Sequence, residues 1–93
     1  MIEVFGINKT ENFNCPGCSY FKKLCEENSI EYEFNDVTKF DNKLGTNVLD
    51  RDKIVKLAGR AKFRTLRITY PVIFDGNDTP LTLKEFMLKY DLY

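Results

Sequence analysis

Residues 12–28, NFNCPGCSYFKKLCEEN, place two cysteines three positions apart, with only a proline and a glycine between them. After this pair the apolar residues Cys18, Phe21 and Cys25 follow one another at intervals of three and four. This spacing lines one face of a helix. The stretch therefore predicts a helix over 15–27 that begins at the cysteine pair.

The proline after the first cysteine indicates where this helix starts. Proline is favoured at the first helical position, because its missing N–H would have no partner there. With Pro16 in that position, Cys15 is the N-cap, and its sulfur faces unpaired N–H groups and the positive end of the helix dipole. Both stabilise a thiolate, the attacking form of cysteine. Cys18 lies about one turn later, within reach of a disulfide with Cys15, so thiol–disulfide exchange is expected.

Other interpretations of the pair remain. A structural disulfide that closes so small a loop adds little stability and is rare in a reducing cytosol. A zinc site needs four ligands, whereas the chain has three cysteines and no histidine. A metal-binding alternative is an iron–sulfur cluster shared by two chains through their Cys15 thiolates, which would colour the purified protein.

Cys25 has a different environment in this interpretation. It follows Cys18 by seven residues, about 10 Å by helical rise, which is too far for a disulfide. Its place in the apolar stripe indicates a buried thiol that acts as a small hydrophobe. A regulatory thiol open to modification is the alternative.

Size and composition indicate a small globular protein. The 93 residues fit one domain over 1–93, and an apolar content of 43% suffices for a packed core. Fourteen basic residues balance fourteen acidic ones, so neither nucleic acid nor an anionic membrane is an expected partner. We find no membrane-spanning run and no secretion signal, and three cysteines are too few for a disulfide scaffold. A cytoplasmic protein with reduced resting thiols is expected.

Hydrophobic periodicity predicts the element order β-α-β-α-β-β-α. The expected elements are strands over 2–7, 30–37, 71–74 and 79–81, and helices over 15–27, 49–60 and from 82 to the end of the chain. The segment 38–47 is expected to be a polar connection. Asp50 fits the N-cap of the second helix and Gly59 its end. Thr82 and Glu85 match a capping box at the start of the last helix.

Residues 69–76, TYPVIFDG, place a proline at the start of an apolar strand, a position where its missing N–H is tolerated. Taken alone, this proline is expected to follow a trans bond, because cis bonds are a minority even before proline. Together with the CPxC pair, KLCEENSIEYEFNDV (23–37) and KLAGR (56–60), however, the stretch resembles the glutaredoxins. The similarity covers nearly the whole chain and is closest to small phage-type members. It implies a thioredoxin-like fold, with a central four-stranded mixed sheet flanked by about three helices.

The resemblance also implies a site. Its catalytic residues are Cys15 and Cys18 with the spacers Pro16 and Gly17, and its substrate contacts are Tyr70 and Pro71 with the adjacent Thr69. Position in the sequence adds further candidate substrate-binding residues: Thr82, which precedes the free N–H groups of the last helix, and the basic residues Arg60, Lys62, Arg64 and Arg67 before Tyr70. Cys15 is expected to attack and Cys18 to resolve the mixed disulfide. The Tyr70–Pro71 bond is expected to be cis and to lie beside Cys15. The backbone of Tyr70 would then pair with an extended substrate such as glutathione.

The implied function is that of a monomeric electron carrier without a metal or bound cofactor. Glutathione is the expected co-substrate, and disulfide-containing proteins, ribonucleotide reductase among them, are the expected electron acceptors. For a phage protein the location would be the host cytoplasm. An alternative within redox chemistry is a thioredoxin-like carrier that a thioredoxin reductase reduces.

Three features depart from the family pattern. Gly17 stands where an aromatic residue is common, and Asn14 stands where a basic residue is usual. The segment NDTPLTLKEF (77–86) lacks the glycine pair that holds the glutamyl end of glutathione. The four basic residues over 60–67 are therefore expected either to attract anionic substrates or to form a solvated surface loop.

Overall fold

The computed structural model of the protein describes residues 2–92. Its elements are β1 (Ile2–Gly6), α1 (Pro16–Glu27), β2 (Tyr32–Asp36), β3 (Thr38–Asp41), β4 (Thr46–Leu49), α2 (Arg51–Ala61), β5 (Val72–Asp75) and α3 (Leu83–Tyr90). The α/β class and the three helices agree with the sequence prediction, whereas the observed order is β-α-β-β-β-α-β-α. Among residues 2–92, no helix combines the length and apolar character needed to cross a bilayer.

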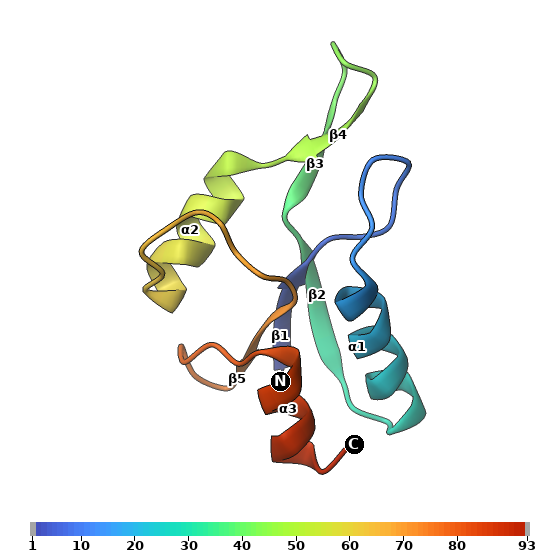
Figure 1. The fold of residues 1–93 in the computed structure, drawn as a ribbon, viewed down its shortest axis with the longest axis vertical. Helices are drawn as coiled ribbons and strands as arrows, with labels where there is room; N and C mark the ends of the chain where they lie inside the picture. The colour runs from blue at the N-terminus through green and yellow to red at the C-terminus, as the bar shows by residue number, and fades with distance from the viewer. Residues whose placement is uncertain (1, 93) are drawn as a thin grey trace.

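A mixed sheet with the strand order β2-β1-β5 lies at the centre of the fold. β1 runs parallel to β2 and antiparallel to β5. Figure 1 shows α1 and α2 on opposite sides of these strands, with α3 beside α1. Because β1 and β2 are parallel, their carboxyl ends lie at the same end of the sheet. The loop that leads to α1 starts at this end.

The side chains of β1 alternate between two apolar clusters, as the pleat of a strand requires. Ile2 and Val4 point to the face covered by α1 and α3, where they pack with Phe21 and Phe86. Phe5 points to the other face and packs against the cluster that α2 forms with β5. The central strand is therefore buried on both faces, and it provides a rigid base for the segments at its carboxyl end.

The predicted polar connection over 38–47 is wrong, because a β-hairpin occupies residues 38–49. Thr38 pairs with Leu49, and Asp41 pairs with Thr46. The carboxylate of Asp41 accepts hydrogen bonds from the N–H groups of Lys43 and Leu44 and so closes the turn. Figure 1 shows this hairpin projecting beyond the sheet. Its sequence gives no clear strand signal because both strands are short and only partly buried.

The predicted four-stranded sheet is also wrong. The chain over 79–81 contributes only an isolated bridge, in which Ile73 and Leu81 exchange both backbone hydrogen bonds. Pro80 has no N–H to extend the ladder. The next residue, Thr82, already serves as the N-cap of α3. A fourth strand therefore has no room to form.

Helix ends follow the local signals with one exception. Asp50 caps α2, and Thr82 forms the expected capping box with Glu85. Gly59, however, does not end α2, which continues to Ala61. Lys62 then takes the left-handed conformation that terminates the helix, with φ of 60°.

Asp75 at the end of β5 holds α3 against the sheet, and its contacts predict that the stability of the fold depends on pH in the acid range. Its carboxylate accepts hydrogen bonds from Lys89 Nζ at 2.8 Å and from the Tyr90 hydroxyl at 2.7 Å. The bond from Lys89, followed by that from Tyr90, lowers the pKa of Asp75 below its ordinary value of 3.8. A carboxylate with a lowered folded pKa stabilises the fold above its unfolded pKa, and this contribution is lost as pH falls through the folded pKa.

We expect the replacement Asp75→Asn to lower the free energy of unfolding near neutral pH and to flatten its decline below about pH 4. Urea unfolding at a series of pH values measures both effects. The variant Asp52→Asn, at an exposed position on α2, is the matched control. An unchanged pH profile in Asp75→Asn would show that these contacts contribute nothing to stability.

Candidate redox site

The cysteine pair lies at the start of α1, as the sequence predicts. Cys15 is the N-cap, Pro16 is the first helical residue, and the Cys15 sulfur accepts a hydrogen bond from the Cys18 N–H at 3.2 Å. The two sulfurs form a disulfide, with the Cα atoms 5.2 Å apart. Cys15 is partly exposed, whereas Cys18 is 1% exposed. Cys15 therefore has the more accessible of the two sulfurs.

The segment that faces the pair contains the expected cis proline. The Tyr70–Pro71 bond is cis, so this prediction is confirmed. A Cβ atom added at Gly17 would lie 3.1 Å from Pro71 Cδ, 3.5 Å from the Tyr70 carbonyl oxygen and 3.8 Å from Leu83 Cδ2. The first turn of α1, the cis-proline segment and the start of α3 thus meet at Gly17. Because Gly17 has no side chain, these three segments can approach one another closely.

Thr82 and Thr69 flank the same junction along the chain. The Thr82 hydroxyl accepts a hydrogen bond from the Glu85 N–H at 3.1 Å, and the Glu85 carboxylate accepts one from the Thr82 N–H at 2.9 Å. The Thr82 side chain therefore has a structural role as a helix cap. Thr69 is exposed immediately before the cis bond.

Arg60 has partners that the sequence did not reveal. It donates two hydrogen bonds to the Glu3 carboxylate, at 2.9 and 3.0 Å, and one to Asp78 at 2.7 Å. The bonds from Arg60 lower the pKa of Glu3. The guanidinium carbon also lies 4.0 Å from the centre of the Phe74 ring. Arg60 thus ties the end of α2 to β1 and to the turn after β5.

These contacts place Arg60 on the face of the sheet opposite the cysteines. Gly6 of β1 faces Cys18, and Glu3 lies three residues earlier on the same strand. Side chains an odd number of positions apart point to opposite faces of a sheet. A cavity of about 500 Å³, which Arg60 helps to line, lies between α2 and this opposite face.

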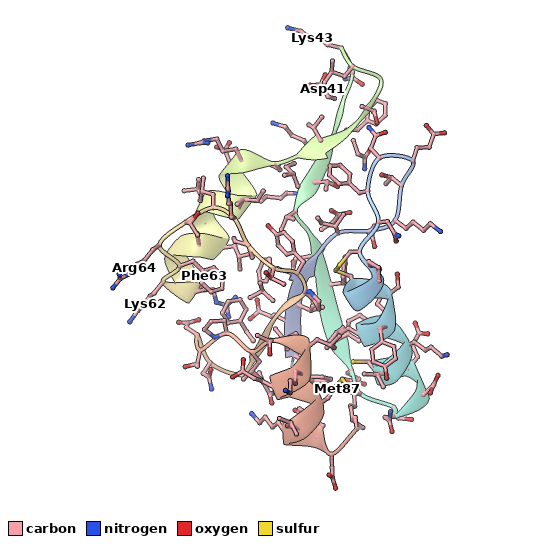
Figure 2. All side chains as sticks on the ribbon, in the orientation of Figure 1. Asp41, Lys43, Lys62, Phe63, Arg64 and Met87 are labelled. Carbon is pink, nitrogen blue, oxygen red and sulfur yellow. A yellow bond between two sulfur atoms is a disulfide. The ribbon has the colours of Figure 1, made fainter. Side chains whose placement is uncertain are left out.

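The other basic residues lie on the loop between α2 and β5. Lys62, Arg64 and Arg67 are all exposed. In Figure 2, Lys62 and Arg64 point outward at the far side of α2, well apart from α1. The structure does not gather these two cations around the sulfur pair.

The chain is similar in sequence to a phage protein. No family model matches the chain. A protein of enterobacteria phage T4 is 40% identical over 85 residues, which cover 91% of this chain and 79% of the T4 protein. The chain belongs to the family of this T4 protein. The relative is described as an uncharacterized 11.8 kDa protein in the Gp55-nrdG intergenic region, so it supplies no activity.

In this chain, the CxxC disulfide at a strand–helix junction is consistent with a thioredoxin-like fold. The pair at a helix N-terminus suggests redox activity. The chemistry therefore has to be inferred from the site itself.

Gly6 is a site residue that our sequence analysis missed. A Cβ atom there would lie 2.7 Å from the Cys18 sulfur and 3.1 Å from Phe34 Cζ. The Ile7 N–H, next in the chain, donates to the Cys18 sulfur at 3.5 Å. The available signal was a glycine within an otherwise apolar strand, which often marks a close approach of other atoms to the backbone.

Cys25 occupies the buried position that the apolar stripe predicts. Its side chain has no solvent exposure and packs in the cluster beneath α1. Burial, with a smaller effect of Glu26, raises the pKa of the Cys25 thiol to about 11. The thiol therefore stays neutral at neutral pH and is a poor nucleophile.

Proposed function

We propose that the protein is a dithiol, glutaredoxin-like thiol–disulfide oxidoreductase. One observation carries this proposal: a partly exposed cysteine caps a helix whose first turn also meets a cis-proline segment at Gly17. The cap position supplies a directed N–H and the positive end of the helix dipole, both of which stabilise a thiolate at Cys15. The second cysteine lies in bonding distance on the same turn.

The proposed reaction has two exchange steps. The Cys15 thiolate attacks a disulfide of the substrate, and the other substrate sulfur leaves as a thiolate. The Cys18 thiolate then attacks the Cys15 sulfur, the Cys15–substrate bond breaks, and the intramolecular disulfide forms. Two electrons pass from the protein to the substrate. Two glutathione molecules, oxidised to glutathione disulfide, return the protein to its dithiol form.

The proposed substrate surface is centred on Tyr70. Among residues 2–92, no backbone–backbone hydrogen bond involves its N–H or C=O, so both can pair with an extended peptide such as glutathione. Thr69, Thr82 and Arg67 are retained in this proposal as nearby polar groups. Arg60 is left out because its hydrogen bonds to Glu3 and Asp78 lie across the sheet. Lys62 and Arg64 are left as solvated loop residues.

The proposed partners are glutathione and disulfide-containing proteins, with ribonucleotide reductase as one possible acceptor. We further propose one domain over 1–93 that acts as a monomer in the cytoplasm of the host, without a metal or bound cofactor. Two features favour a second reductant. The bare Gly17 and the missing glycine pair remove two family contacts for glutathione, so reduction by a thioredoxin reductase is the second candidate.

A coupled assay separates these possibilities. The oxidised protein is supplied with hydroxyethyl disulfide and either glutathione plus glutathione reductase, or a thioredoxin reductase alone, and NADPH consumption is recorded. We expect turnover with glutathione, and none for Cys15→Ser; Cys25→Ala is the control and should retain wild-type turnover. Turnover with the thioredoxin reductase alone would identify that enzyme, and not glutathione, as the reductant. No turnover with either reductant would reject the proposed oxidoreductase function.

A further inference from the structure

The sulfur of Cys18 has unusual surroundings for a group that must become charged. The sulfur is nearly enclosed, and both the sulfur and the Phe34 ring lie against Gly6. Among residues 2–92, the Ile7 N–H is the one hydrogen-bond donor to this sulfur. Burial disfavours a thiolate, whereas a hydrogen bond to the charged form favours it. The position of the Ile7 N–H therefore affects how readily Cys18 ionises.

The side chain of Asn8, the residue after Ile7, makes one hydrogen bond on each side, and we call these two bonds the Asn8 clamp. Lys22 Nζ donates to Asn8 Oδ1 at 2.5 Å, and Asn8 Nδ2 donates to Asp36 Oδ2 at 3.0 Å. Lys22 and Asp36 belong to α1 and to the end of β2, so the clamp joins helix, loop and sheet. Asn8 thus holds the chain directly beside the Ile7 amide.

Lys22 makes a second contact in this region, with the ring of Phe34. It follows Cys18 by four residues, one turn along the same side of α1. Its ammonium group lies 3.8 Å above the centre of the Phe34 ring, and the edge of that ring lies against Gly6. Lys22 therefore contacts both the Phe34 ring and the Asn8 side chain, the two groups next to Gly6 and Ile7.

The charged and titratable groups around Cys18 are few. Lys22 comes from α1, Asp36 comes from β2, and Cys15 is the reaction partner. Cys25 faces the same side of α1 but is neutral, since burial raises its pKa to about 11. β1 presents Gly6 on this face, and the cis-proline segment presents Pro71, neither of which ionises. Two cations therefore lie near Asp36: Lys22 of α1, through Asn8, and Lys53 of α2, which donates to the Asp36 carbonyl oxygen at 3.3 Å.

We propose that Lys22 is a positioning residue for the resolving step: by holding Asn8, it aims the Ile7 amide at the Cys18 sulfur and favours its thiolate. This inference rests on the proposed function. In the step, the Cys18 thiolate attacks the Cys15 sulfur of the mixed disulfide, and the Cys15–Cys18 bond forms. The substrate sulfur leaves as a thiolate and takes its proton from water. The dithiol supplies both electrons.

A single-turnover reaction with dithiobis(nitrobenzoate) tests this role, because each exchange step releases one coloured thionitrobenzoate. The first release reports attack by Cys15, and the second reports resolution by Cys18. All proteins carry Cys25→Ala so that no third thiol contributes. The test variant is Lys22→Met. The control is Lys23→Met, which removes the adjacent, exposed lysine paired with Glu27.

We expect Lys22→Met to slow the second release by about 2–5-fold near neutral pH, the range set by one partly exposed charge contact. The pH midpoint of that release should rise, and its rate should recover at alkaline pH, where Cys18 ionises without help. The first release should change less, and Lys22→Arg should restore the second. Asn8→Ala should act in the same direction as Lys22→Met, because it breaks the same clamp.

The outcomes separate the inference from the function on which it rests. If the wild-type protein releases no second thionitrobenzoate, the two-thiol reaction itself is rejected. If it releases both, and Lys22→Met leaves the rate and pH midpoint of the second release unchanged, the positioning role is overturned. A lower urea midpoint for Lys22→Met without a shifted pH midpoint would assign Lys22 a structural role alone.

Discussion

Replacing Gly6 by alanine is expected to destabilise the oxidised protein by about 1–3 kcal/mol, the usual cost of overpacking a closed site. The new Cβ atom would lie 2.7 Å from the Cys18 sulfur and 3.1 Å from Phe34 Cζ. The backbone of Gly6 cannot withdraw freely, because β1 pairs with a strand on each edge, and the Cys18 sulfur cannot move freely, because it is bonded to Cys15. In the dithiol form the Cys18 sulfur can rotate about its Cα–Cβ bond, so Gly6→Ala should destabilise the protein less. The variant should therefore be reduced more readily.

Two measurements on Gly6→Ala follow from this difference. Urea unfolding of the oxidised form gives the loss of stability, and equilibration with glutathione buffers gives the shift in the dithiol–disulfide ratio. The control is Gly59→Ala in α2, where an added Cβ meets no atom within 4 Å. That change should be neutral or stabilise by up to about 1 kcal/mol. A Gly6→Ala protein with wild-type stability and redox equilibrium would contradict the close approach.

The parts of the site that could be predicted from the sequence depend on local chemistry. Pro16 specifies where α1 begins, and this alone makes Cys15 the N-cap. Thr82 and Glu85 satisfy each other's backbone groups within one turn. In such cases the partners are near in sequence, so the spacing of residue types determines the geometry. The cis bond before Pro71 is different, because it was expected from family resemblance and not from the residues alone.

The parts that could not be predicted depend on partners distant in the chain. Arg60 and Glu3 are 57 positions apart, and nothing near Arg60 indicates that it leaves the basic loop for the opposite face of the sheet. The hairpin over 38–49 was missed for a related reason. Its strands are held mainly by pairing with each other, so they lack the apolar alternation that burial against a core imposes. Pairing is a non-local property that exposed residues such as Phe40 do not reveal.

Replacing Phe21 by alanine is expected to have the largest effect on stability, a loss of about 3–5 kcal/mol. Phe21 has no solvent exposure, and its ring lies 4.9 Å from that of Phe86 and 5.5 Å from that of Tyr32. It therefore joins α1 to α3 and to β2. A domain of this size has about 5–15 kcal/mol of total stability, so the variant should be close to unfolding at moderate temperature.

The control for Phe21→Ala is Tyr20→Ala, one position earlier on α1, where the side chain is 45% exposed and the change should cost less than about 0.5 kcal/mol. Urea unfolding of both oxidised variants measures the difference. Because α1 carries Cys15 and Cys18 on its first turn, loosening its anchor should also let Cys18 move away from the Ile7 amide. The Phe21 variant should then lose resolving rate even under conditions where it is still folded. If its unfolding free energy stayed within about 1 kcal/mol of the wild type, the cluster beneath α1 would not be what holds the redox pair in place.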